Sequence, residues 1–200
     1  VHVVPNGLEL DPPTVTAKID VRAFGSPIIG YVGNLSSRID IDLLDALARA
    51  RPRWQFVFVG STHLDPAILR LDEHANVHFL GVVHHHQARA IMADFDVALI
   101  PHIDNEMTQS MNPLKAFVYA SVGVPVVSTP IANLGELGGL ISIASGVDGF
   151  VTAIEAELTK PRTSVDRARL EPHSWWSRLK SVLDLIDGIG RGDSPLGPNN

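Results

Sequence analysis

Two basic residues stand where this sequence could bind a phosphate group. Lys115 lies one turn inside a helix predicted to begin at Pro113, and Arg38 ends a polar loop that starts at Gly33 after an apolar segment. The N-terminus of a helix offers unpaired N–H groups and a partial positive charge, both of which favour a bound anion. The alternative is two solvated surface charges. The position of both residues after apolar segments favours binding, more for Lys115 than for Arg38.

Polar side chains between residues 101 and 112 could serve the same site. Asp104 and Glu106 could accept hydrogen bonds from hydroxyl groups or take part in acid–base chemistry. A solvated acidic loop is the plainer alternative for these carboxylates. Asn112, which precedes the predicted helix, could bond a ligand or cap the helix, and capping is the commoner role of asparagine.

Three consecutive histidines, His84 to His86, raise the question of a metal site. Neighbouring side chains of a strand or a helix point in different directions and do not converge on one ion, although a loop could bring two together. No Asp, Glu or Cys lies nearby at ligand spacing. We therefore interpret the run as a turn leading into the next helix, and we predict no metal site.

Several common signatures are missing from the sequence. The loop from Gly33 to Arg38 does not match Gly-x-Gly-x-x-Gly, and there is neither a P-loop nor a Gly-x-Ser-x-Gly motif. The chain has no cysteine, which excludes disulfides and thiolate metal sites. Its net charge of −6 argues against sequence-independent nucleic-acid binding, which needs a basic surface. No apolar run reaches the roughly 18 residues of a membrane span.

The elements that must position these residues alternate along the chain. Strands are expected at residues 27–32, 54–60, 76–80, 96–100, 124–128 and 140–144. Helices are expected at residues 39–51, 66–71, 86–95, 113–122, 147–158 and 174–186, the last capped by Ser174. Strands that are apolar on both faces and alternate with helices predict an α/β fold: a Rossmann-like three-layer sandwich with a parallel sheet of about six strands and helices on both faces.

In such a sheet the loops at the carboxyl ends of the strands meet near one crevice. These loops are residues 33–38, 81–86 and 101–112. We divide the chain into a linker or arm (residues 1–26), a ligand-binding domain (residues 27–187) and a Gly- and Pro-rich tail expected to be disordered (residues 188–200).

A longer set of motifs follows in a fixed order. It comprises Val4-Pro5-Asn6-Gly7, Ile29 to Leu35, Asn76 to Gly81, Phe95 to Pro101, Asn105 to Thr108, Asn112-Pro113-Leu114-Lys115, Tyr119, Gly123 to Thr129 and His173-Ser174-Trp175. This order resembles the carboxyl-terminal, donor-binding domain of GT-B-fold retaining glycosyltransferases (group 1, family 4-like). The resemblance covers about residues 1 to 187.

The resemblance implies a site for a nucleotide-sugar donor such as a UDP- or GDP-sugar, with no metal required. The backbone of Gly81, Val82 and Val83 would hold the nucleobase. The diphosphate would meet Gly33, Arg38, Asn112, Leu114 and Lys115. The sugar and ribose region would involve Glu106, Thr108, Ser110 and Val118. Catalytic residues are left unassigned.

Enzymes of this kind transfer a sugar, typically a hexose in polysaccharide biosynthesis, to an acceptor held by a second, amino-terminal domain. The resemblance therefore implies that domain as a partner, with no nucleic acid involved. It also implies a cytoplasmic location, with peripheral membrane association of the full protein left open. The last helix would then pack against the missing domain, and Trp175 and Trp176 are expected to be unusually exposed.

Two departures from the family pattern bear on donor binding. The family usually carries a Glu-x7-Glu pair whose second Glu accepts hydrogen bonds from the ribose; Ser110 and Val118 stand at these positions. A lost recognition bond is worth roughly 1 to 3 kcal/mol, or about 5- to 150-fold in affinity. In the first loop Asn34 and Ile39 replace the usual basic residues, and Arg38 lies one position away.

These departures leave two alternatives to a working transferase. One is a degenerate, non-catalytic module that keeps the fold as an interaction or regulatory surface. The other is one half of a nucleotide-sugar epimerase of the same fold.

Overall fold

A six-stranded sheet forms the centre of the computed structural model, which describes residues 4, 6–11, 14–109, 114–131, 141–162 and 167–190. The strands lie in the order β3-β2-β1-β4-β5-β6, and all paired neighbours are parallel. Their bounds are β1 Ile28–Val32, β2 Gln55–Val59, β3 Val77–Gly81, β4 Val97–Ile100, β5 Val126–Ser128 and β6 Ile141–Ile143. The predicted parallel α/β fold is confirmed.

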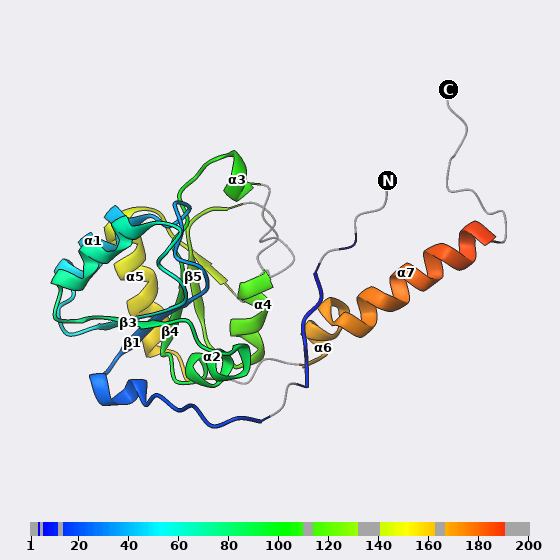
Figure 1. The fold of residues 1–200 in the computed structure, drawn as a ribbon, viewed down its shortest axis with the longest axis horizontal. Coiled ribbons are helices and arrows are strands. Elements are labelled where there is room, and N and C mark those ends of the chain that lie inside the picture. Colours follow the sequence, from blue (N-terminus) through cyan, green and yellow to red (C-terminus); the bar gives the residue numbers. More distant parts are fainter. Residues whose placement is uncertain are drawn as a thin grey trace.

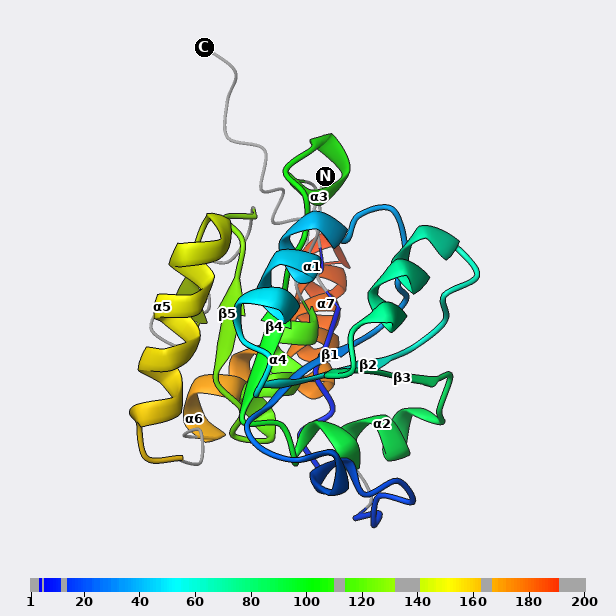
Figure 2. The ribbon, with the colours of Figure 1, turned by 90° about the vertical axis from the view of Figure 1, so that its left-hand side faces the viewer.

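Helices cover both faces of the sheet (Figures 1 and 2). One face packs against α1 (Ile41–Ala50), the 3-10 helix η2 (Pro66–Glu73) and α5 (Gly146–Thr159). The other packs against α2 (His85–Met92), α4 (Leu114–Ser121) and α6 (Arg167–Leu170). The remaining elements are η1 (Val21–Phe24), α3 (Glu106–Gln109), η4 (Glu171–His173) and α7 (Trp175–Gly190). Because both faces are covered, the central strands are apolar throughout, as the sequence indicated.

Strand β1 shows how the two faces are packed. Ile29 and Tyr31 belong to the core on the α1 side, whereas Ile28 belongs to the core on the α2 side. At Gly30 a β-carbon would lie 2.1 Å from ring atoms of Phe95. The glycine is therefore required for the close approach of Phe95 to the sheet.

Most predicted elements are confirmed, with ends that differ by up to four residues. Helix α1 begins at Ile41 rather than at residue 39 because the Asp40 carboxylate accepts a hydrogen bond from the amide of Leu43 (2.9 Å) and caps it. Helix α2 ends at Met92, not at Phe95. The predicted start of α4 at Pro113 lies outside the described residues.

The predicted arm is partly ordered against the domain. Leu8 is buried, its amide donates to the carbonyl of His173 (2.7 Å), and its carbonyl accepts from the amide of Trp175 (3.0 Å). Farther along, Asp11 pairs with Arg167 (2.5 Å). The amino-terminal arm thus lies beside the segment that enters the last helix. Sequence periodicity missed this because the contact is a single strand-like pairing between distant segments.

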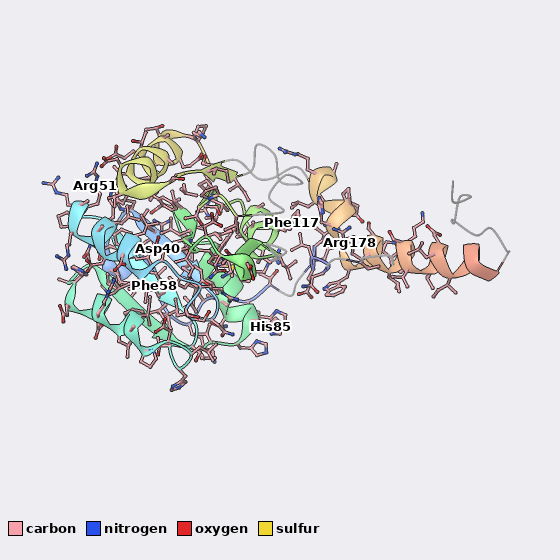
Figure 3. All side chains as sticks on the ribbon, turned by 90° about the horizontal axis from the view of Figure 1, so that it is seen from above. Asp40, Arg51, Phe58, His85, Phe117 and Arg178 are labelled. Atoms are coloured by element: carbon pink, nitrogen blue, oxygen red, sulfur yellow. The ribbon has the colours of Figure 1, made fainter. Side chains whose placement is uncertain are left out.

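Helix α7 projects away from the sheet (Figures 1 and 3). Ser174 caps it, as predicted, by accepting from the amide of Ser177 (3.1 Å). Its apolar side chains are exposed: Trp175 58%, Trp176 70%, Leu179 49%, Leu183 51% and Ile186 57%. The expected exposure of the two tryptophans is confirmed. The helix continues through Gly190, so the first part of the predicted tail is helical, and residues 191–200 lie outside the described residues.

None of the described helices has both the length and the apolar character needed to cross a bilayer.

Candidate anion-binding site

The order of the strands reverses between β1 and β4, which lie side by side at the centre of the sheet. Ligands of open parallel sheets bind at the carboxyl ends of the strands at this point. At this point backbone hydrogen bonds join the loop after β1 to the loop after β4. The amide of Asp40 donates to the carbonyl of Pro101, and the amide of Ile103 donates to the carbonyl of Arg38, both at 2.8 Å. A short antiparallel bridge between Ile39 and His102 completes the link. Arg38 is thereby held beside the end of β4.

The Lys115 ammonium closes the site from α4. Its Nζ lies 3.8 Å from the centroid of the Tyr31 ring, within range of a cation–π interaction. A β-carbon at Gly33 would lie 2.7 Å from the same nitrogen, and Gly33 has a φ of +142°. Both the space and the backbone conformation therefore favour glycine at this position.

Tyr119 holds α4 against the end of β1. Its hydroxyl is fully buried and accepts a hydrogen bond from the amide of Val32 (2.8 Å). Burial raises the pKa of this phenol, so it stays neutral. Because Tyr119 lies one turn after Lys115 on the same helix, this bond fixes the register that brings Lys115 to Gly33.

Buried nitrogen atoms without hydrogen-bond partners gather in this site. Among the described residues they are Nε of Arg38, Nζ of Lys115 and both ring nitrogens of His102. Buried polar groups are almost always paired in folded proteins, so each exception needs an explanation. An anion bound among these three side chains would supply the missing acceptors.

The electrostatics of the site lead to the same conclusion. Burial, with Arg38 nearby, holds the pKa of Lys115 well below its usual value. Burial and the neighbouring Lys115 and Arg38 lower the pKa of His102 to about 3. Burial raises the pKa of Tyr31 to about 12, against the opposing effect of Arg38. The site therefore disfavours further positive charge and would be stabilised by a negative one.

The structure brings together three of the five predicted diphosphate residues: Gly33, Arg38 and Lys115. Leu114 is half-buried at the start of α4, next to Lys115. Asn112 lies outside the described residues, as does Ser110 of the predicted sugar region.

Sequence reasoning missed two residues of this cluster. His102 follows β4 by two positions, and a polar residue after a buried strand is a signal that could have identified it. Tyr31 gave no such signal, because an aromatic residue within an apolar strand is typical of a core.

The predicted nucleobase residues lie at the carboxyl end of β3. The Gly81 carbonyl accepts from the amide of Gly60 (2.8 Å), and Gly81 has a φ of +66°. Val82 is 75% exposed, and Val83 is half-buried beside it. These residues form an open edge toward which a planar base could lie, and their role stays a prediction.

The predicted sugar region falls on α3 and α4. Thr108 is fully buried; its hydroxyl donates to the carbonyl of Ile103 (2.7 Å) and accepts from the amide of Asn105 (3.0 Å). This hydroxyl therefore shapes the loop. Glu106 lies at the first position of α3. Val118 is half-buried on α4 against the core on that face. Ligand contacts by these residues stay predictions.

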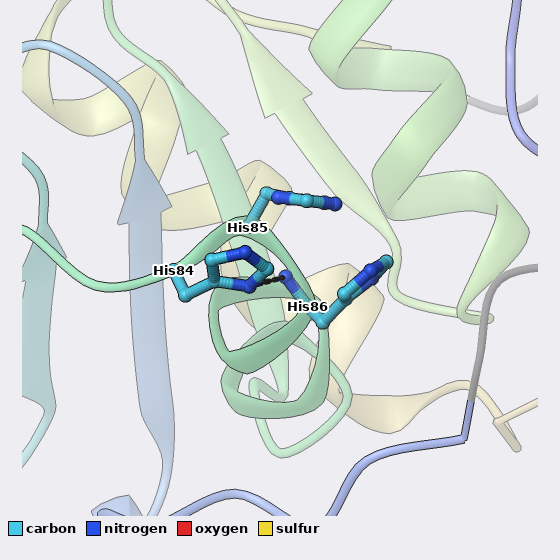
Figure 4. A group of neighbouring side chains, drawn as sticks. All are labelled: His84, His85 and His86. Carbon is cyan, nitrogen blue, oxygen red and sulfur yellow. Dashed lines mark hydrogen bonds between the residues drawn. The ribbon is translucent and has the colours of Figure 1, made fainter.

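The three consecutive histidines form a turn into α2, as predicted, but their rings converge, contrary to our expectation (Figure 4). The ring centroids are 3.8 to 5.2 Å apart, and one nitrogen from each ring lies within 4.8 Å of the others. The reason is that His84 has an extended backbone before the helix begins, so its ring does not point in the direction that helical spacing would give it.

Comparison with known proteins identifies the family. The model of the family described as "Glycosyl transferases group 1" matches residues 26–160, more than half of the chain. The chain belongs to the group 1 glycosyltransferases. A similar curated protein is the putative teichuronic acid biosynthesis glycosyltransferase TuaH of Bacillus subtilis (strain 168), 24% identical over 143 residues, which cover 68% of this chain and 36% of TuaH.

Solved structures similar to this glycosyltransferase chain share its fold. Sucrose-phosphate synthase from Thermosynechococcus elongatus superposes with a TM-score of 0.73 at 20% identity, over 96% of this chain and 53% of that protein. Anabaena HepE, solved in complex with UDP and glucose, gives a TM-score of 0.63 at 16% identity, over 80% of this chain and 48% of HepE. The chain thus spans about half of these structures, and its fold matches one half of a GT-B glycosyltransferase.

The buried imidazole predicts a specific dependence of stability on pH. The pKa of His102 is about 3 in the folded protein against a usual value of 6.5, so the unfolded chain binds more protons between these values. Stability should therefore fall as the pH is lowered through this window. From pH 7 to pH 4 the loss through His102 is about 3 kcal/mol.

Replacing this residue tests the dependence. In His102→Phe, urea unfolding from pH 7 to pH 4 should show a correspondingly smaller loss of free energy of unfolding. His63→Phe, at an exposed position, is the control. Equal pH profiles for wild type and His102→Phe would contradict the burial of an uncharged imidazole.

Proposed function

We propose that this chain is the donor-binding, carboxyl-terminal domain of a glycosyltransferase that uses a nucleoside-diphosphate sugar. The observation that carries the proposal is the cluster of buried nitrogens of Arg38, His102 and Lys115 at the strand-order reversal, which have no hydrogen-bond partner in the described part of the chain. A diphosphate provides several charged acceptors for such donors. UDP in the solved complex of HepE is a ligand of this class.

The same groups would assist the transfer itself. Breaking the bond between sugar and diphosphate leaves negative charge on the departing phosphate. Fixed positive groups aimed at that charge stabilise the transition state. In this proposal Arg38 and Lys115 provide the stabilisation without a metal ion. The open end of β3 at Gly81 to Val83 would receive the base.

The acceptor would be bound by a second domain. The solved relatives are about twice as long as this chain, which leaves room for another domain of similar size. We propose that this domain covers the apolar side of α7, where Trp175 and Trp176 are exposed. The relative TuaH is named for teichuronic acid biosynthesis, and we propose an acceptor from the biosynthesis of a polysaccharide for this chain.

Nucleotide binding tests the proposal directly. We expect UDP, GDP or a sugar derivative of one of them to bind the chain in calorimetric titrations. Lys115→Met should weaken binding by about 10- to 150-fold, because a hydrogen bond to a charged group contributes about 1.5 to 3 kcal/mol. Lys180→Met, at an exposed position on α7, is the matched control. Absence of binding at millimolar concentration, or equal affinities in the two variants, would refute the proposal.

The half-buried Val118 favours a second candidate, a domain that has lost part of its donor recognition. Its side chain packs against the core and offers no acceptor for the ribose hydroxyls. In that case the fold would serve as an interaction or regulatory module.

Restoring a carboxylate separates the two candidates. If a ribose contact is missing, Val118→Glu should raise nucleotide affinity by about 5- to 150-fold. Val118→Ala controls for the lost packing. Affinity in Val118→Glu no higher than in Val118→Ala would show that this position does not limit donor binding.

A further inference from the structure

His102 is a buried polar residue whose ring nitrogens have no hydrogen-bond partner among the described residues. The residue is only 2% exposed. Its backbone is held firmly: the amide donates to the Thr129 hydroxyl (3.1 Å), and the Thr129 hydroxyl donates to the His102 carbonyl (2.7 Å). A ring fixed in this way, with two unused nitrogens, is costly unless something else uses them.

The groups that act on the ring most directly are the basic residues Lys115 and Arg38 and the neutral phenol of Tyr31. The centroid of the His102 ring lies 6.4 Å from that of Tyr31, in an edge-to-face arrangement, and the Lys115 ammonium lies over the same Tyr31 ring. The titratable and charged groups on the surrounding elements are Tyr31 of β1, Arg38 and Asp40 before α1, and Lys115 of α4. Asp104 follows His102 in the loop after β4, and Glu106 begins α3. Asp40 is engaged in capping α1.

We propose that His102 is a third ligand of the donor diphosphate and takes up a proton from solvent when that anion binds. This inference rests on the proposed function, because it requires a diphosphate between Arg38 and Lys115. In the free site the burial of the ring, together with the neighbouring Lys115 and Arg38, keeps it neutral. A bound diphosphate reverses the sign of the local potential and favours the imidazolium. The protonated ring then donates an N–H to a phosphate oxygen.

Solvent supplies the proton, an N–H bond forms on the ring, and no bond of the diphosphate breaks. One nucleotide and up to one proton therefore bind together. By linkage, diphosphate affinity then rises as the pH falls. Lys115 is the other group that could take up this proton, since its pKa is also lowered in the free site. The experiment must distinguish the two.

Calorimetry in two buffers of different ionisation enthalpy, such as MES and Bis-Tris at pH 6.5, near the usual pKa of an imidazole, measures the protons taken up per UDP or GDP bound. We expect substantial uptake in the wild type, its loss in His102→Phe together with several-fold weaker binding, and its persistence in Lys115→Met. His102→Gln, which keeps a polar side chain without titrating, should behave as His102→Phe does. In the wild type, the NMR signals of the His102 ring should change to those of an imidazolium on saturation.

The outcomes separate this inference from the proposed function. Binding without proton uptake would overturn the role of His102 and leave the donor site standing. Uptake that persists in both His102 variants but is lost in Lys115→Met would assign the proton to Lys115, which also overturns it. No binding of any nucleotide would refute the proposed function, and this inference with it.

The histidine cluster at the start of α2 supports a second, independent inference. One nitrogen from each of His84, His85 and His86 lies within 4.8 Å of the others, and His84 and His85 are exposed. Three nitrogens at about 2.0 to 2.1 Å from a tetrahedral zinc ion lie roughly 3.4 Å apart, so small side-chain rotations close the gap. We infer that these three imidazoles bind Zn²⁺, with water in the remaining position.

Zinc titration of the full chain, followed by calorimetry and by the NMR signals of the rings, tests this inference. The positive N-terminal end of α2 opposes a bound cation, so the affinity should be no tighter than micromolar. His84→Ala and His86→Ala should each weaken binding by about tenfold or more, whereas His63→Ala should not. Mg²⁺, which prefers oxygen ligands, should leave the rings unchanged. Zinc affinity unaffected by either replacement would overturn the inference.

Discussion

The Lys115 ammonium lies against Gly33 and the ring of Tyr31, with its nitrogen buried and Arg38 close by. Two basic side chains and a buried imidazole at one place lower the stability of the fold. Burial and the repulsion between like charges both disfavour their protonated forms. Such an arrangement is kept only when the surrounding structure enforces it. It also prepares the site for an anion, since the donors are already desolvated and oriented before the ligand arrives.

The rest of the fold enforces this arrangement. Tyr119 ties α4 to β1 through the amide of Val32, and backbone bonds join the loop of Arg38 to the end of β4. The reversal of strand order places these two strands side by side, so that their following loops share one edge. Close approach is possible because Gly33 has no side chain and Gly60 leaves space for its carbonyl: a β-carbon at Gly60 would lie 2.0 Å from the Gly33 oxygen.

The fold and part of the site could be predicted from the sequence because they depend on local patterns. Apolar runs predicted the strands, and Lys115 and Arg38 were identified from their positions after those strands. The role of Tyr31 and the burial of His102 depend on contacts between segments far apart in the chain, which no local pattern encodes. The converging histidines illustrate the same limit: the extended backbone of His84 decides where its ring lies, and helical spacing gave the wrong expectation.

The measurement that tests this account most directly is the pKa of Lys115, followed by NMR of its side-chain carbon next to the amine, with and without a bound nucleoside diphosphate. We expect a pKa well below the usual value of 10.5 in the free protein and a marked rise when UDP or GDP binds. An ordinary pKa in the free protein that does not move on addition of either nucleotide would contradict a buried cationic site built for an anion.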